Sequence, residues 1–167
     1  MVATQEWVQA QVGALLDHIQ HAHADDPRTA AVVSKVRGVR AQDVLESSTT
    51  PAPGTWHSGK YKHSTGELFV ALRDLSGAPR PASSIRKTIV HELAHATRSK
   101  NSGEASHSQQ WKQTWLWLLN VATAELGWEV DVRCAECSYY GLCDTHQCPR
   151  CRWMLNLCKP YVGQLLP

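Results

Sequence analysis

Apolar residues recur at helical spacing near the start of the chain, and this predicts a first helix capped by Thr4 and running to about Ala24. The apolar positions are Trp7, Val8, Val12, Leu15, Leu16 and Ile19. Asp26 and Pro27 have the order of a helix cap and a first helical residue, so a short second helix is expected, which Gly38 would end. Residues 1–46 are therefore predicted to form the N-terminal helices.

The pattern changes after a Pro- and Ser-rich loop at 46–55. Residues 55–63 and 67–72 favour two strands, with a turn at 64–66, and together they predict a β-hairpin over 55–73. A second loop at 75–83 leads to a helix over about 83–99, whose apolar stripe is Ile85, Ile89, Leu93 and Ala96. A further helix is expected from about Ser106 to Leu126, followed by a short strand at 128–133. The expected fold class is α+β with a small antiparallel sheet.

Composition fits a folded protein, with 167 residues, 43% hydrophobic residues and 19% charged residues. The sequence contains no apolar run of about 18 residues, and its polar N-terminus does not have the pattern of a signal peptide. We therefore expect no membrane partner and an intracellular location. A formal charge of +2 is too small to indicate nucleic-acid binding by itself.

The predicted helix at 83–99 contains the sequence HELAH at 91–95. His91 and His95 are four residues apart, so on a helix both imidazoles project from one face and can bind a single zinc ion. Glu92 lies beside them, where a carboxylate can act as the base for a metal-bound water, as in HExxH zinc peptidases. The histidines are expected to face away from the apolar stripe, toward a cleft.

A catalytic zinc usually has a third protein ligand, and several residues could supply it. Arg98 and Asn101 stand where the metzincin pattern requires Gly and His, so that class is excluded. His107 is the preferred third ligand, because it begins the next predicted helix in register with its inward stripe, Trp111, Trp115, Leu118 and Ala122. Glu104 and Glu125 are the alternatives. His18, His21 and His23 are interpreted as surface residues.

Six cysteines lie in the last fifth of the chain, at positions 134, 137, 143, 148, 151 and 158. Their clustering favours metal binding in a reducing compartment over a secreted disulfide framework. Two CxxC pairs predict a zinc ribbon with one structural zinc ion, bound by Cys134, Cys137, Cys148 and Cys151. Cys143 could replace one of these ligands, and His146 is a more remote substitute.

Aromatic and basic residues are interleaved around the cysteines, which is a pattern that can stack on bases and neutralise phosphates. Packing of the rings against the rest of the protein is the alternative. The possible nucleic-acid contacts are Arg133, Tyr139, Tyr140, Arg150, Arg152 and Trp153.

The combination of HELAH, a downstream His followed by SQQW, a tryptophan-rich helix and a Cys-knuckle module resembles the SprT-like family of zinc metalloproteases, which includes the Spartan-type DNA-dependent proteases. The resemblance spans about residues 1–158. It implies a zincin-like core at 1–131, with its active-site helices at 83–126, and a zinc-ribbon subdomain at 132–167. It also implies Glu92 as the catalytic base, His91, His95 and His107 on the catalytic zinc, and a ribbon that assists DNA binding.

The expected function is then a zinc endopeptidase, stimulated by DNA, that cleaves proteins bound or crosslinked to DNA in DNA-damage repair. The implied partners are such protein substrates and single-stranded or distorted DNA, for a monomer in the nucleus or, outside eukaryotes, the cytoplasm. Two alternatives stay open: a nucleic-acid-binding zinc-ribbon protein with a silent HExxH site, and a peptidase indifferent to DNA.

Overall fold

The computed structural model describes residues 2–44, 58–97, 108–133 and 140–143. The helices are α1 (Gln5–Ala22), α2 (Pro27–Val33), α3 (Ala82–Ala96) and α4 (Gln109–Asn120), and α4 continues directly into a π-helix, η1 (Val121–Glu125). The strands are β1 (Gly38–Gln42), β2 (Gly59–Lys62), β3 (Glu67–Ala71), β4 (Val130–Arg133) and β5 (Tyr140–Cys143). No helix within these ranges is long and apolar enough to cross a membrane.

Two helix starts follow the predicted capping. The Thr4 hydroxyl accepts a hydrogen bond from the backbone N–H of Trp7 at 3.2 Å, and Asp26 accepts one from the N–H of Arg28 at 2.9 Å. The second helix ends earlier than predicted, with Ser34 as its C-cap, and Gly38 begins strand β1 instead of ending a helix. Residues 1–46 therefore contain a strand in addition to the two predicted helices.

The main sheet has the strand order β1-β3-β2, and it is mixed where the sequence predicted an antiparallel one. The predicted hairpin is present as β2 and β3, which pair antiparallel, while β1 pairs with β3 in parallel. Strand β1 is also held by the side chain of Gln5 in α1, which donates to Val39 O at 2.9 Å and accepts from the N–H of Ala41. These long-range contacts explain why local patterning did not reveal β1.

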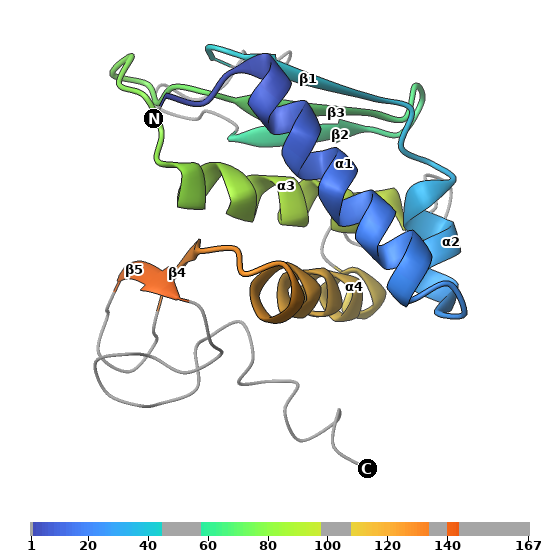
Figure 1. The fold of residues 1–167 in the computed structure, drawn as a ribbon. Helices are drawn as coiled ribbons and strands as arrows, with labels where there is room; N and C mark the ends of the chain where they lie inside the picture. The colour runs from blue at the N-terminus through green and yellow to red at the C-terminus, as the bar shows by residue number, and fades with distance from the viewer. Residues whose placement is uncertain (1, 45–57, 98–107, 134–139, 144–167) are drawn as a thin grey trace.

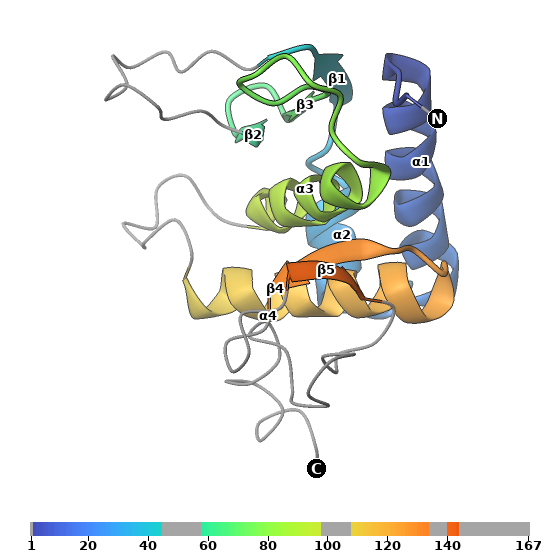
Figure 2. The same cartoon turned by 90° about the vertical axis from the view of Figure 1, so that its left-hand side faces the viewer.

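Helix α3 lies between the sheet and α4, and α1 runs along the side of this stack from β1 to η1 (Figure 1, Figure 2). The buried guanidinium of Arg80 joins β3 to α3, donating to Ala71 O and to Thr88 Oγ1, each at 2.7 Å. The arrangement places the HELAH segment of α3 between the hairpin and the tryptophan-rich helix.

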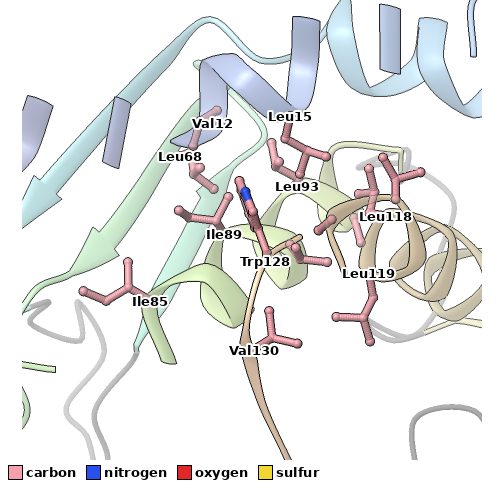
Figure 3. Packing of buried hydrophobic residues seen from close by; sticks show 14 of the residues in the cluster. Val12, Leu15, Leu68, Ile85, Ile89, Leu93, Leu118, Leu119, Trp128 and Val130 are labelled. Atoms are coloured by element: carbon pink, nitrogen blue, oxygen red, sulfur yellow. The ribbon is translucent and has the colours of Figure 1, made fainter. Parts of the chain in front are cut away.

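The predicted apolar stripe of α3 is buried, which confirms that part of the sequence pattern. Figure 3 shows this stripe packed among side chains from α1, β3 and α4, with Trp128 near the centre. The labelled members are Val12, Leu15, Leu68, Ile85, Ile89, Leu93, Leu118, Leu119, Trp128 and Val130. Because Trp128 and Val130 belong to this core, the start of β4 packs with the main body of the fold.

The helix predicted over 106–126 is divided into two kinds of helix. Helix α4 is capped by Ser108, whose hydroxyl accepts from the N–H of Trp111 at 3.3 Å, and it changes to the π-helix η1 at Val121. Gly127 ends the segment with φ of +64°.

In the predicted ribbon, β4 and β5 pair antiparallel, but the four proposed cysteine ligands lie outside the described residues. The zincin-like core, the ribbon and the domain division stay predictions.

Candidate functional site

The two histidines of the HELAH segment lie next to each other on α3. Their Nε2 atoms are 3.4 Å apart and their ring centroids 5.1 Å apart. Two donor atoms bound to one tetrahedral zinc at about 2.0–2.1 Å stand roughly 3.3 Å from each other. The geometry of His91 and His95 therefore fits two ligands of one ion.

The histidine face of α3 packs against indole rings of α4. The ring centroid of Trp111 is 4.8 Å from that of His91 and 5.2 Å from that of His95, and Trp115 lies 6.1 Å from His91. The two indoles stack on each other at 5.2 Å. The predicted inward stripe of the downstream helix does reach the histidines, and it covers part of the face that was expected to open on a cleft.

Glu92 is buried under strand β2, with only 7% of its surface exposed. Burial raises the pKa of its carboxyl group to about 7, although a hydrogen bond from the backbone N–H of Tyr61 opposes the shift. One carboxylate oxygen lies 4.0 Å from His91 Nε2. A Cβ at Gly59 would come within 2.7 Å of Glu92 Cγ, so glycine at that position lets the strand approach the carboxylate closely.

The third ligand is not established by the described residues. The preferred His107 and the alternative Glu104 lie outside them. The other alternative, Glu125, is engaged elsewhere: its Oε2 lies 2.7 Å from His18 Nε2 and 3.0 Å from His23 Nε2. His18 and His23 were interpreted as surface residues, so sequence reasoning missed this cluster.

Most of the predicted ribbon and nucleic-acid residues also lie outside the described ranges, namely Cys134, Cys137, Cys148, Cys151, Tyr139, Arg150, Arg152 and Trp153. Of the remaining two, Arg133 and Tyr140 are directly paired across the β4–β5 ladder. The structural zinc and the nucleic-acid contacts stay predictions.

Comparison with known proteins decides the family. A family model described as Phycodnaviridae minor capsid protein P4 matches residues 2–162. The chain belongs to this family. It is 35% identical over 150 residues to the minor capsid protein P4 of Paramecium bursaria Chlorella virus 1, an alignment that covers 90% of this chain and 81% of the relative. No solved structure matches the chain significantly.

Membership of the P4 family overturns the assignment to the SprT-like proteases. The expectations of a zinc endopeptidase, of Glu92 as its catalytic base, of DNA-bound protein substrates and of a role in DNA-damage repair are wrong, because the family is one of capsid proteins. The two alternative functions, a nucleic-acid-binding ribbon protein and a DNA-independent peptidase, fail for the same reason. The comparisons also give no support to a nuclear location or a reducing compartment. The spacing that suggested a protease describes the geometry of two side chains on a helix, and proteins of other functions share it.

Proposed function

We propose that this chain is a minor capsid protein, a structural component of a viral shell of the Phycodnaviridae type. The family match over residues 2–162 carries the proposal, supported by the relative whose name states that role. A match of this length includes the core, the HELAH helix and the cysteine segment together, so it does not depend on one short motif. The partners are then other proteins of the capsid, assembled in the infected host cell.

The contacts of the HELAH segment are consistent with a structural role. His91 and His95 pack on the Trp111 ring, and Glu92 accepts a hydrogen bond from the backbone of β2. These three side chains therefore connect α3 to the two elements on either side of it.

The capsid role can be tested on purified particles. After a high-salt wash and protease treatment of intact virions, we expect the chain to remain at a constant ratio to the major capsid protein, measured by quantitative mass spectrometry. A non-structural viral protein from the same cells serves as the control and should be removed. Removal of the chain together with that control would contradict the proposal.

We also propose that His91 and His95 bind a zinc ion that is structural in this fold. The 3.4 Å separation of their Nε2 atoms supports this, and His107 stays the predicted third ligand. Zinc bound by His91, His95 and His107 would join α3 to the segment that precedes α4 by coordination bonds.

Metal analysis of the purified chain tests the zinc proposal. His91→Gln and His95→Gln should each lower bound zinc by about one ion per chain. His21→Gln is the matched control, because His21 is exposed and its Nδ1 lies 2.7 Å from a carbonyl oxygen of its own helix, Asp17 O. Unchanged zinc in both HELAH variants would show that the pair is only packed against tryptophan.

A further inference from the structure

A second group of metal-binding side chains lies where the end of α1 meets η1. Ligand atoms of His18, His23 and Glu125 all lie within 4.8 Å of one another. Both imidazoles approach the same carboxylate oxygen through Nε2, at 2.7 and 3.0 Å. The cluster joins parts of the chain that are 107 and 102 residues apart in sequence.

The end of α1 explains how two histidines five residues apart can converge. On a continuous helix their side chains would point about 140° apart. Helix α1 ends at Ala22, and His23 is its C-cap with φ of −128° and ψ of 36°, outside the helical range. The His23 side chain therefore does not follow the helical repeat, and its ring can turn back toward His18.

The π-helix supplies the third member of the cluster. Glu125 is the last residue of η1, a five-residue π-helical segment. Such segments are rare in proteins, and those that occur often lie at functional sites. A carboxylate oxygen is an ordinary ligand for zinc, so Glu125 completes a set of two imidazoles and one carboxylate.

Zinc would require the three ligand atoms to move to an even spacing. Ligand atoms around a tetrahedral zinc stand roughly 3.3 Å apart, so the His–Glu distances of 2.7 and 3.0 Å must lengthen by roughly 0.6 and 0.3 Å. The ligand atoms of the two histidines, which lie within 4.8 Å of each other, must reach the same spacing. The three side chains are 28–32% exposed, which leaves them room to rotate and leaves one side open to water. Each imidazole would move its proton from Nε2 to Nδ1, exchanging a hydrogen bond to the carboxylate for a coordination bond.

The surrounding charges are compatible with a bound cation. The guanidinium of Arg28 lies over the Trp117 ring at 4.6 Å, and the His23 ring meets the same indole edge-on at 5.9 Å. Arg28 forms an ion pair with Asp26 at 2.5 Å, which offsets its positive charge. A pair of ordinary hydrogen bonds from the histidines to the glutamate is the competing interpretation.

We propose that His18, His23 and Glu125 bind a zinc ion, with water as the fourth ligand. The ion fastens the C-terminal end of α1 to the end of the α4–η1 helix. This site is separate from the HELAH histidines, and it does not depend on the proposed capsid function.

Zinc titration of the full chain, freed of metal by a chelator, tests the site. Calorimetry should show one zinc equivalent fewer in Glu125→Gln and in His18→Gln than in the parent chain, while His21→Gln binds as many equivalents as the parent chain. Glutamine at 125 retains a hydrogen-bond acceptor of similar size but removes the charge, so a simple hydrogen-bonded cluster would survive the change better than a metal site. In parallel, nitrogen NMR of the histidine rings should show Nε2 of His18 and His23 losing its proton together during the titration.

Two results would overturn the proposal. One is the same number of zinc equivalents in Glu125→Gln as in the parent chain. The other is a parent spectrum in which zinc leaves the His18 and His23 rings unchanged or shifts the exposed His21 ring equally. The ring spectra use the unmodified protein, so they decide the question even where a variant folds poorly.

Discussion

The two histidine pairs of this protein differ in what surrounds them. His91 and His95 lie on one face of α3 and are packed against the stacked indoles of α4. His18 and His23 lie at the end of α1, partly exposed, and meet a single carboxylate from η1. One pair is part of the interface between two helices, and the other connects two chain segments at the surface.

This difference separates two ways in which imidazoles can contribute to a fold. At the inner pair, ring packing acts whether or not a metal is bound, so its loss should cost stability through lost burial. At the outer pair, contacts between partly exposed polar groups contribute little by themselves, and a bound ion would supply most of the effect. The two regions should therefore respond differently to loss of an aromatic neighbour, to added volume and to loss of charge.

The largest contrast is expected from the tryptophans beside each pair. Trp111→Ala removes a buried ring that contacts both inner histidines, and we expect the free energy of unfolding to fall by about 3–5 kcal/mol. Trp117→Ala removes a half-buried ring beside His23, and a loss of about 1–2 kcal/mol is expected. Urea unfolding followed by circular dichroism measures both. Equal losses of unfolding free energy in the two variants would contradict the difference in burial proposed for the two histidine pairs.

A smaller effect is expected from adding one methyl group next to the inner pair. In Gly59→Ala the new Cβ would meet Thr88 Cγ2 and lie 2.7 Å from Glu92 Cγ, which forces β2 away from α3. Overpacking of this kind costs about 1–3 kcal/mol. The change should also weaken the hydrogen bond from Tyr61 to Glu92, because the strand must move.

Gly13→Ala is the matched control on the helix that carries the outer pair. A Cβ at Gly13 meets nothing within 4 Å, and the residue lies inside α1, so we expect a gain of about 0.5–1 kcal/mol from reduced freedom of the unfolded chain. Thermal and urea unfolding of both variants should give shifts of opposite sign. A loss of stability in Gly13→Ala would mean that this face of α1 does not have room for the added methyl group.

The inner pair was accessible from sequence because its geometry is local. A spacing of four residues on a helix with an apolar stripe fixes where His91 and His95 point. Their contact with Trp111 was not predicted, because the histidines were expected to face a cleft. The caps at Thr4 and Asp26 and the hairpin are local in the same sense. Strand β1 was missed because its alternation of apolar and polar residues covers only positions 39–42 and none of them is fully buried. Its place depends on pairing with β3 and on Gln5.

The outer cluster and the function depended on information that short patterns do not contain. His23 lies near His18 because α1 ends at Ala22, one residue before it. Glu125 lies near both histidines at the end of a π-helical turn, which the residue pattern did not predict. The function was predicted wrongly because two histidines four residues apart report where side chains lie and not what the protein does. Similarity along nearly the whole chain provided the family that the motif could not.

The smallest effect is expected at the outer pair in the absence of metal. Glu125→Gln removes the charge from contacts that are about one-third exposed, so without zinc the free energy of unfolding should fall by less than about 1 kcal/mol. With zinc present, the parent chain gains stability in proportion to how far the ion concentration exceeds its dissociation constant, and the variant loses the share contributed by this site. Urea unfolding of the parent chain and of Glu125→Gln, each with a chelator and with zinc, therefore gives four free energies of unfolding. The change in the parent–variant difference between the two conditions is the contribution of the metal at this site. If parent and variant differ by the same small amount in both conditions, the outer histidines contribute hydrogen bonds alone, and the two pairs differ only in their burial.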